Sequence, residues 1–357
     1  MNILILGNHC DPGGVTRYMI NLASGLTSRG NRVIVASDRG AWRTLFEDKG
    51  IRHAEIPIRT KSIVSPKIFF SLWRLRELLG SEKIDIVHAN TRVTQCLAYY
   101  IWFFFRIPYV SAFHGYYRSS LMRRMMNFSG MKAIAVSNAV KRHMIDDLNI
   151  PEASVSVVYN GISLADFLEK HRDKKEFNFS SGDIVMGVLG RISQEKGHFC
   201  ALQAFKRVYA RNKNIFLVFS GQGKLEAKLR ESIVRENLTE RVRFINAEAA
   251  DFLDIIDLLL VPSRQEGFGY AVIEAFAKGV PVIGYNVGGI AEIIRHRDNG
   301  LLFYRYSPEA LAEAIETLLA DGHLRSAICR TAADDVQLFS IDAMAANTEE
   351  VYKSVLA

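Results

Sequence analysis

Short apolar runs alternate with amphipathic stretches along most of this chain. The runs carry Val, Ile and Leu at consecutive positions, which is typical of strands buried on both faces of a parallel sheet. The stretches between them place apolar residues three and four positions apart, which predicts helices. Strands that alternate with helices in this way predict an α/β protein with doubly wound parallel sheets.

The pattern occurs twice, with a polar interruption in between. In the first half we expect strands at residues 2–6, 32–36, 84–88, 108–113, 132–136 and 155–158, and helices near 16–29, 66–79, 91–105 and 138–148. In the second half we expect strands at 184–189, 215–220, 242–246, 258–261 and 281–285, and helices at 197–211, 225–236, 252–257, 270–278, 290–294 and 308–321.

The chain has 357 residues, which is long enough for two domains. We place them at residues 1–165 and 183–340, with the boundary in the segment 163–183. A last helix at 341–357 follows the second sheet.

Positive charge is concentrated in the first half. Residues 1–160 contain 21 Lys and Arg and 11 Asp and Glu, whereas the remainder contains 24 and 27. A basic half indicates an anionic partner such as a membrane surface or a phosphorylated acceptor, although a well-solvated surface explains the same excess. We expect no nucleic-acid partner, because the chain has no zinc finger, no paired aromatics of the RNA-binding type and no long basic helix.

Cysteine usage and hydropathy favour a cytoplasmic location. The four cysteines are far apart and show no metal-binding spacing, so we expect reduced thiols and no bound metal. The first residues, MNILILG, predict a buried strand rather than a signal peptide. The longest apolar run, 97–105, is too short to span a bilayer.

The segment 91–126 combines aromatic, basic and methionine residues. Its aromatic run 99–105 is followed by Arg118, Arg123 and Arg124 among tyrosines, Leu and Met. This composition suits an anionic lipid surface, which predicts peripheral contact with the inner face of the plasma membrane. A buried helix followed by a solvated basic loop explains it nearly as well.

The clearest chemistry lies in residues 262–279, which follow the apolar run 258–261. Two glycines predict a tight turn into a helix. The amides of Gly269, Tyr270 and Ala271 would then have no partner inside the helix, and with the helix dipole they favour a phosphate.

Two carboxylates bracket these amides, Glu266 in the turn and Glu274 in the helix. At a rise of about 1.5 Å per residue, Glu274 lies roughly 6–8 Å along the helix. The stretch could therefore offer a hydroxyl acceptor, a phosphate cradle and a second hydroxyl acceptor in that order. Glutamates near a helix start also simply complement the dipole, but Glu274 has apolar neighbours, and there a carboxylate needs a hydrogen-bond partner.

Glu266 and Glu274 match an E-x7-E signature, and the surrounding PSRQEGFGYAVIEAFAKGVPVIGYNVGG resembles glycosyltransferase family 4. The resemblance covers most of the chain and is strongest over 190–289. It implies a GT-B fold, with two Rossmann-like domains facing across a cleft and the final helix packing back on the first. It also implies that Glu266 contacts the donor sugar, that Glu274 contacts the ribose, and that the donor is lined by Phe268, Gly269, Tyr270 and Ala271.

Two further loops of the second half carry candidate site residues. Arg191 and Lys196 follow a predicted strand, and two cations there can neutralise a leaving diphosphate. Their R-x4-K-G pattern resembles the diphosphate-binding pair of the family, although Lys196 in isolation could be a solvated loop residue. Gly221 and Gly223 resemble the family's G-x-G loop beside the nucleotide, and a structural turn explains them nearly as well.

In the first half, Gly13 and Gly14 follow the first strand and open a helix. Their position resembles the family's glycine loop at the donor diphosphate, although a plain tight turn is an equal alternative. His114 ends a strand, where the resemblance implies a sugar or transition-state contact and a structural histidine is the ordinary alternative. Asp11 is a weak candidate for a base. The segment 244–248, FINAE, departs from the family by lacking a glycine after the strand, which puts the base contacts in doubt.

The resemblance implies a retaining hexosyltransferase with an NDP-sugar donor, expected to be UDP-linked, and no cofactor. Its acceptor would be a glycan or a lipid-linked sugar in polysaccharide or lipopolysaccharide synthesis, and the leaving phosphate would take the acceptor proton. The sequence has no Asp-x-Asp motif at the end of a predicted strand, so we expect no bound metal ion. The alternatives are a nucleotide-sugar 2-epimerase, a soluble-acceptor synthase of the same fold and a non-catalytic sugar-nucleotide-binding protein. A dinucleotide oxidoreductase is disfavoured because the first loop lacks G-x-G-x-x-G.

Overall fold

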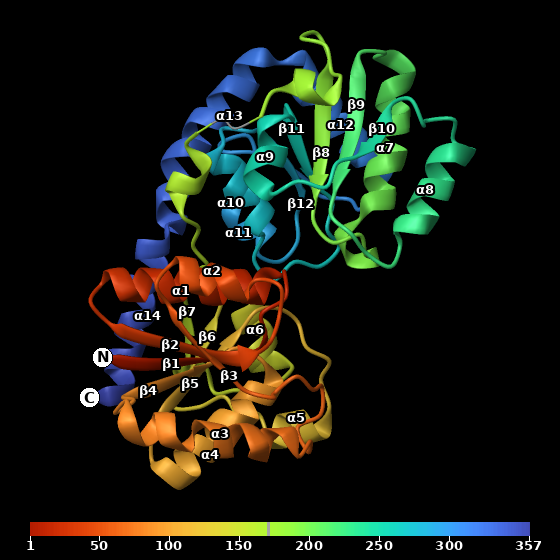
Figure 1. Ribbon diagram of the computed structural model, residues 1–357. Coiled ribbons are helices and arrows are strands. Elements are labelled where there is room, and N and C mark those ends of the chain that lie inside the picture. The colour runs from red at the N-terminus through yellow and green to blue at the C-terminus, as the bar shows by residue number, and fades with distance from the viewer. Residues whose placement is uncertain (170–171) are drawn as a thin grey trace. The chain divides into compact units, whose positions relative to one another are not determined.

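The computed structural model describes residues 1–169 and 172–357, which form two compact units (Figure 1). The N-terminal unit comprises Met1–Ile162 and Phe339–Ala357, and the C-terminal unit comprises Ser163–Leu338. Each unit has its own parallel sheet between layers of helices, so the predicted α/β class and doubly wound architecture are confirmed. Residues Lys170 and His171, in the expected boundary segment, lie outside the described residues.

The sheet of the N-terminal unit has seven parallel strands in the order β3-β2-β1-β4-β5-β6-β7. The strands are β1 (Asn2–His9), β2 (Arg32–Asp38), β3 (Arg52–Glu55), β4 (Ile86–Ala89), β5 (Tyr109–Phe113), β6 (Lys132–Ala135) and β7 (Val155–Val157). The helices are α1 (Gly14–Ser28), α2 (Arg43–Asp48), α3 (Lys67–Ser81), α4 (Arg92–Phe105), α5 (Leu121–Met125), α6 (Asn138–Asp146) and α14 (Ile341–Leu356).

Successive residues of β1 point to opposite faces of this sheet, as the two-residue period of a strand requires. Ile3 and Ile5 face α1 and α14, in a core that also holds Tyr352. Leu4 and Leu6 face α3 and α4 in a second core. The sheet is therefore buried on both sides, which explains the continuous apolar runs in the sequence.

The sheet of the C-terminal unit has six parallel strands in the order β10-β9-β8-β11-β12-β13. They are β8 (Ile184–Leu189), β9 (Ile215–Ser220), β10 (Val242–Phe244), β11 (Leu258–Val261), β12 (Val282–Tyr285) and β13 (Leu301–Phe303). The helices are α7 (His198–Arg211), α8 (Glu226–Arg235), α9 (Ala249–Asp254), α10 (Tyr270–Ala277), α11 (Ile290–Ile293), α12 (Pro308–Ala320) and α13 (Gly322–Asp335). Short 3-10 turns lie at Leu164–Phe167, Lys174–Phe177 and Gln194–Lys196.

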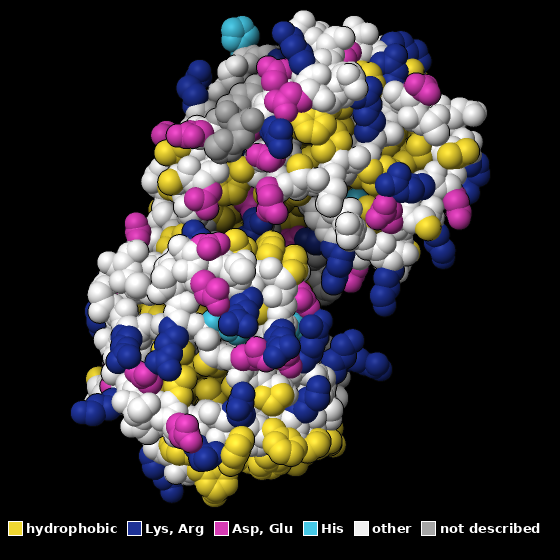
Figure 2. Space-filling view, in the orientation of Figure 1, with side chains coloured by type: hydrophobic (Ala, Val, Ile, Leu, Met, Phe, Trp, Pro, Cys, Tyr) yellow, Lys and Arg dark blue, Asp and Glu magenta, His cyan; other side chains and the backbone are white. Residues whose placement is uncertain are grey.

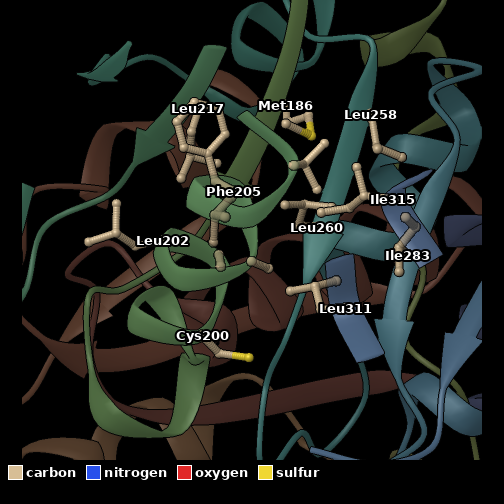
Figure 3. Close-up of a cluster of buried hydrophobic side chains, with 14 of the residues drawn as sticks. Met186, Cys200, Leu202, Phe205, Leu217, Leu258, Leu260, Ile283, Leu311 and Ile315 are labelled. Atoms are coloured by element: carbon tan, nitrogen blue, oxygen red, sulfur yellow. The ribbon is translucent and has the colours of Figure 1, made fainter. Parts of the chain in front are cut away.

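One core of this unit lies between the sheet and helices α7 and α12 (Figure 3). Leu258 and Leu260 of β11 point into it, opposite Phe205 of α7 and Ile315 of α12. All four side chains are at most 2% exposed, so β11 cannot slide along its neighbours without exposing apolar surface.

Both sheets contain a point where the strand order reverses. In the first sheet β2 and β4 lie on either side of β1, and in the second β9 and β11 lie on either side of β8. Loops that leave neighbouring strands in opposite directions open a crevice at the carboxyl ends, where α/β proteins bind ligands. The loops after β1, β8 and β11 lie at these points, and they carry most of the candidate residues.

The sequence missed several short or weakly buried elements. Strand β3 has no fully buried residue, and β13 has only three residues, although all three are buried. Helix α13 was also missed, since only Ile328 and Ala332 of its fourteen residues are buried. Helix α9 begins at Ala249, three residues before the predicted start, and β10 ends at Phe244 instead of 246.

Helix α14 packs on α1 at a glycine. A Cβ atom added at Gly25 would lie 2.6 Å from Cγ2 of Ile341 and 2.8 Å from Cβ of Ala345. Gly80, near the end of α3, has open space around the same position. Both glycines are helical, but only Gly25 has another helix packed against it.

We expect Gly25→Ala to lower the free energy of unfolding by about 1–3 kcal/mol, because α14 must shift to accept the methyl group. Gly80→Ala should raise it by roughly 0.5–1 kcal/mol, because alanine favours a helix. Urea unfolding followed by circular dichroism measures both. Equal effects of the two substitutions would show that the α1–α14 contact is not close-packed.

Candidate active site

Three loops of the C-terminal unit meet backbone to backbone at the carboxyl ends of β8, β9 and β11. The amide of Gly190 donates to Ser220 O at 2.9 Å, and the amide of Arg264 donates to Glu195 O at 2.7 Å. A Cβ atom at Gly221 would lie 2.2 Å from Gly190 O, a distance that no side chain tolerates. The loops are therefore held at one spacing by main-chain contacts.

Gly197 and Gly223 serve the same packing. A Cβ atom at Gly197 would lie 1.9 Å from Pro262 O, and one at Gly223 would lie 2.1 Å from Ile192 O. Gly197 also has φ +73°, a conformation that L side chains rarely adopt. Gly221 and Gly223 thus have a sufficient structural reason to be glycine, whatever ligand lies beside them.

Lys196 and Glu266 form an ion pair across two of these loops. Lys196 Nζ lies 2.5 Å from Glu266 Oε2, and Ser263 Oγ donates to the same oxygen at 3.4 Å. The two side chains are 30% and 16% exposed, so a ligand can reach both. A partly exposed pair stabilises the fold by about 1 kcal/mol or less, which leaves both charges available for binding. Arg191, five residues before Lys196, is exposed on the same loop.

Helix α10 begins directly after Glu266 and the glycine turn. Its N-terminal residue is preceded by Gly269 at φ 118°, no side chain caps it, and its first turn contains no acidic residue. The positive end of the helix dipole is therefore not neutralised by a carboxylate of the first turn, which suits an anionic ligand. Phe268 is 3% exposed and contacts the Tyr270 ring edge-on, while Ala271 lies in the first turn.

Glu274 lies one turn further along α10 and is 2% exposed. Its neighbours Val272, Ile273, Ala275 and Phe276 are buried as well. A carboxylate in this position is not explained by solvent contact or by the first turn of the helix. It is the buried acidic group that the sequence singled out, on the same helix as the proposed phosphate cradle.

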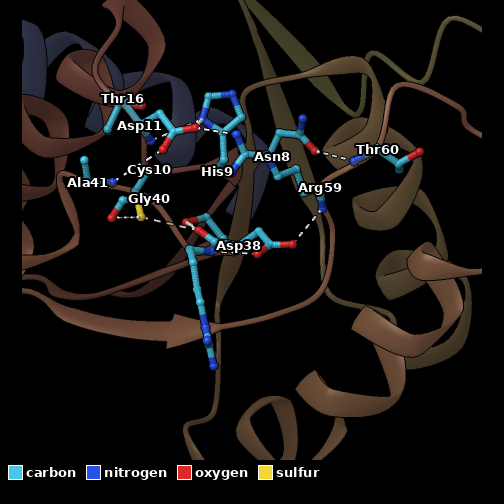
Figure 4. A network of polar contacts seen from close by, with 12 residues as sticks. Asn8, His9, Cys10, Asp11, Thr16, Asp38, Gly40, Ala41, Arg59 and Thr60 are labelled. Carbon is cyan, nitrogen blue, oxygen red and sulfur yellow. Dashed lines mark hydrogen bonds and ion pairs between the residues drawn. The ribbon is translucent and has the colours of Figure 1, made fainter.

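In the N-terminal unit, the loop between β1 and α1 is held by a polar network (Figure 4). The carboxylate of Asp11 accepts from Arg59 at 2.6 Å and from the amide of Ala41 at 3.4 Å, and Thr16 donates to its carbonyl at 2.7 Å. Asp11 is thus engaged in fixing the loop, which weakens its case as a base.

Gly13 and Gly14 differ from the glycines of the C-terminal unit. A Cβ atom at either position would meet open space, and neither residue has a φ that excludes side chains. Both are exposed, at the N-terminus of the fifteen-residue helix α1. The protein itself therefore gives no steric reason for glycine here, whereas a ligand lying against the main chain would.

His114 follows β5 and is oriented by Asn90, a residue that no pattern in the sequence singles out. The Asn90 side-chain amide donates to Leu6 O at 3.1 Å, which turns Oδ1 toward His114 Nε2 at 3.0 Å. His114 Nε2 must therefore carry the hydrogen, leaving Nδ1 as an acceptor. Burial lowers the pKa of His114 to about 4, so the ring is neutral near pH 7.

A second histidine lies behind this site. His88 is fully buried, with Nδ1 2.7 Å from the hydroxyl of Tyr352 and Nε2 3.3 Å from that of Tyr18. Burial, and next the neighbouring His114, lower the pKa of His88 to about 3. Its expected structural role fits this position, since it joins β4 to α1 and α14.

His198, in the C-terminal unit, follows Lys196 and Gly197 directly. It is 1% exposed and lies 5.5 Å from the ring of Phe219. Burial, and next the charge of Lys196, lower the pKa of His198 to about 4. A histidine directly after the R-x4-K-G pattern was a visible signal, but the sequence does not show that it is buried.

Among the described residues, no group of three or more His, Cys, Asp and Glu side chains could hold a metal ion. No described helix is long and apolar enough to cross a membrane. Cys10, Cys96, Cys200 and Cys329 are free thiols.

Comparison with known proteins identifies the family. A model described as Glycosyltransferase Family 4 matches residues 12–166, and one described as Glycosyl transferases group 1 matches residues 169–335. This chain therefore belongs to the family 4, group 1 glycosyltransferases, which confirms the resemblance of residues 262–289.

Several curated relatives align over much of the chain. An uncharacterized glycosyltransferase of Methanocaldococcus jannaschii is 27% identical and covers 96% of this chain and 94% of its own length. N-acetyl-alpha-D-glucosaminyl L-malate synthase of Bacillus anthracis is 26% identical over 79% and 78%. The capsular polysaccharide biosynthesis glycosyltransferase CapM of Staphylococcus aureus is 27% identical over 68% and 66%.

The fold is that of the GT-B glycosyltransferases. The crystal structure of HepE of Anabaena in complex with UDP-glucose has a TM-score of 0.87, with 23% identity, over 99% of this chain and 100% of that one. The GT-B expectation is therefore confirmed for the fold.

Gly221 and Gly223 are closely packed, whereas Gly13 and Gly14 are not, so alanine substitutions should have opposite effects. Gly223→Ala should lower the free energy of unfolding by about 1–3 kcal/mol, because the methyl group meets main-chain atoms that cannot move aside. Gly14→Ala should leave stability unchanged or raise it by up to ~1 kcal/mol, since alanine favours a first helical turn. Thermal and urea unfolding measure both. A destabilising Gly14→Ala would show that the loop, not a ligand, requires glycine there.

The depressed pKa values of His88, His114 and His198 predict that acid lowers the stability of the protein. Each histidine, with an ordinary pKa near 6.5, binds a proton more readily in the unfolded chain than in the folded one. The free energy of unfolding should therefore fall as pH drops below 6.5 toward 4, by up to about 1.4 kcal/mol per pH unit for each histidine. Urea unfolding between pH 7.5 and 4 measures the slope.

His88→Gln should reduce this slope by the contribution of one histidine, while His323→Gln, at an exposed position of α13, should leave it unchanged. A slope that is the same in wild type and His88→Gln would contradict the assignment.

Proposed function

We propose that this glycosyltransferase is a retaining hexosyltransferase that uses a UDP-sugar and transfers the hexose to a glycan or lipid-linked acceptor. One observation carries most of the proposal: the Lys196–Glu266 pair stands immediately before an uncapped helix N-terminus, at the strand-order reversal of the C-terminal sheet. A cation, a carboxylate and a helix dipole within one loop cluster suit a sugar diphosphate.

In the proposed reaction, the bond between the anomeric carbon and the β-phosphate oxygen breaks while the acceptor oxygen bonds to that carbon on the same face. The acceptor proton passes to the leaving phosphate, so no protein base is needed. Arg191, Lys196 and the first amides of α10 hold the diphosphate as its charge grows. Glu266 accepts hydrogen bonds from the hexose, and Glu274 from the ribose.

The N-terminal unit contributes two groups to this proposal. The main chain at Gly13 and Gly14 lies against the diphosphate, for which the open space at both residues leaves room. His114 accepts a sugar hydroxyl through Nδ1, as the orientation by Asn90 requires. A neutral imidazole contributes an oriented dipole rather than a cation, which suits a positioning contact.

The donor and the biological setting are supported by the relatives. A structure that shares this fold was solved with UDP-glucose, and one curated relative makes capsular polysaccharide. We therefore propose UDP as the nucleotide and cell-surface polysaccharide or lipopolysaccharide synthesis as the setting. We also propose that the protein works in the cytoplasm, where its four free thiols would stay reduced.

A soluble-acceptor synthase is the second candidate, because the L-malate synthase of Bacillus anthracis aligns with 79% of this chain. Incubation of the protein with UDP-glucose and UDP-N-acetylglucosamine, with and without acceptors, separates the candidates. Conversion of UDP-N-acetylglucosamine into its C2 epimer, UDP-N-acetylmannosamine, without any acceptor would indicate a nucleotide-sugar 2-epimerase. Transfer to malate or another small acceptor, but not to lipid-linked sugar, would favour the synthase.

Substitution of Lys196 tests the site itself. Lys196→Ala should lower kcat by about 10²–10³, the usual loss when one charge-stabilising group is removed, and leave the melting temperature within a few degrees of wild type. The matched control is Lys228→Ala, which removes an exposed lysine of α8. Steady-state kinetics and thermal unfolding measure both variants.

Donor binding is measured separately, by the rise in melting temperature with UDP or GDP. A ligand at 100 times its Kd stabilises the fold by about 2.7 kcal/mol. Stabilisation by GDP but not by UDP would contradict the nucleotide assignment, and unchanged turnover in Lys196→Ala would contradict the site.

A further inference from the structure

Helices α3 and α4 pack side by side and expose large aromatic side chains to solvent. On α3, Phe69, Phe70 and Trp73 are 53%, 62% and 57% exposed, and at the end of α4, Phe103, Phe104 and Phe105 are 49%, 59% and 38% exposed. We call these six residues the aromatic face. Figure 2 shows hydrophobic side chains gathered at this edge of the N-terminal unit, over α3 and α4.

The aromatic face is one ordered surface rather than scattered side chains. The ring of Phe69 lies 5.1 Å from that of Tyr100, which in turn lies 6.4 Å from Phe104. Phe103 and Phe104 meet edge to face at 5.0 Å. The rings of Phe69, Phe103 and Phe104 are thus joined across the two helices through Tyr100, and an exposed patch of this kind marks an interaction site.

Basic residues surround the aromatic face, and acidic ones are almost absent. Residues 56–76 and 86–145 contain thirteen Lys and Arg and no Asp or Glu. Lys67, Arg74, Arg76 and Arg106 are exposed on or next to the two helices. The guanidinium of Arg76 lies 4.4 Å from the centre of the Trp73 ring. It also lies 3.4 Å from the carboxylate of Glu77, the first acidic residue after the stretch 56–76.

Helix α5 extends the same chemistry. Leu121, Met122 and Met125 are 75%, 61% and 76% exposed, beside the exposed Arg124. Arg92 of α4 donates to the carbonyl of Asn127 at 2.8 Å, which ties the end of this segment to α4. Exposed apolar side chains with basic residues beside them therefore occur on three helices of the N-terminal unit.

We infer that the aromatic face and α5 dock on the surface of an anionic lipid bilayer. Aromatic rings at the boundary of headgroups and acyl chains, with arginine and lysine on the lipid phosphates, match interfacial binding of amphipathic helices. The charge distribution argues against a second copy of this chain as the partner, because two such basic faces repel each other. No helix in the described part of the chain could cross the bilayer, so the contact is at the surface.

This surface is larger than the one expected from the sequence, because α3 lies outside the segment 91–126. The docking goes beyond the proposed transfer reaction and does not rest on it. It would bring the N-terminal unit to a membrane in which a lipid-linked acceptor could reside.

Sedimentation of the full chain with lipid vesicles tests the inference. We expect binding to vesicles of phosphatidylcholine mixed with phosphatidylglycerol at low salt. Binding to phosphatidylcholine alone should be at least about tenfold weaker, because Lys and Arg side chains near the surface are attracted by anionic lipids. The triple substitution Phe70→Ser, Trp73→Ser and Phe104→Ser should weaken binding at least about tenfold by removing inserted aromatic surface.

A matched control removes exposed apolar residues of the C-terminal unit: Val234→Ser, Tyr304→Ser and Leu338→Ser, which are 61–68% exposed. This triple variant should bind vesicles as the wild type does.

A second pair of triple variants tests the charge. One carries Arg74→Glu, Arg76→Glu and Arg106→Glu, and its control carries Lys213→Glu, Lys228→Glu and Arg330→Glu, so that both change the net charge equally. Only the first set should abolish the preference for anionic vesicles.

Three results would overturn the inference. The first is no vesicle binding by the wild type at low salt. The second is equal binding by the aromatic triple variant and its control. The third is a dimer, or a complex with a single-stranded oligonucleotide, that forms without lipid and is lost in the aromatic triple variant. The UDP-induced rise in melting temperature of each variant reports on the donor site separately, so failure of one proposal is distinguishable from failure of the other.

Discussion

Main-chain packing between three strand-end loops is the constraint on which the C-terminal unit depends. At Gly197, Gly221 and Gly223 there is no room for a single carbon atom, because a carbonyl oxygen of the neighbouring loop stands opposite each of them. Main-chain atoms cannot rotate away as side chains do. The positions of Lys196 and Glu266 therefore follow from the backbone contacts of their loops rather than from the modest energy of their ion pair.

The same contacts distinguish glycines that the packing of the protein requires from glycines that it does not require. In the loops after β8 and β9, glycine is needed for the protein to pack against itself. In the loop after β1, there is room for a side chain at Gly13 and Gly14, so the packing of the protein does not itself require glycine there. The sequence does not distinguish the two cases, because in both of them glycines follow a strand and precede a helix.

Charge is organised differently in the two units. Near the strand-end loops of the C-terminal unit, the cation of Lys196 is balanced by Glu266, and burial keeps His198 neutral near pH 7. Over α3, α4 and α5, arginines and lysines outnumber the carboxylates around exposed aromatic rings. A balanced, partly buried cluster suits selective binding of one small ligand, whereas an unbalanced exposed surface suits a large anionic partner.

The sequence by itself determined the α/β class, because strands buried on both faces must be continuously apolar, and it located the E-x7-E stretch that led to the family. It also placed Lys196, Glu266 and His114 in loops after predicted strands, where parallel sheets present their ligand-facing residues. Only the tertiary structure decided that Asn90 orients His114, that His198 is buried, and that Phe69 of α3 and Phe104 of α4 lie on one exposed surface. The reason is that strand and helix periods are local properties of the chain, whereas these arrangements join residues that are far apart in sequence and become neighbours only when helices and strands pack.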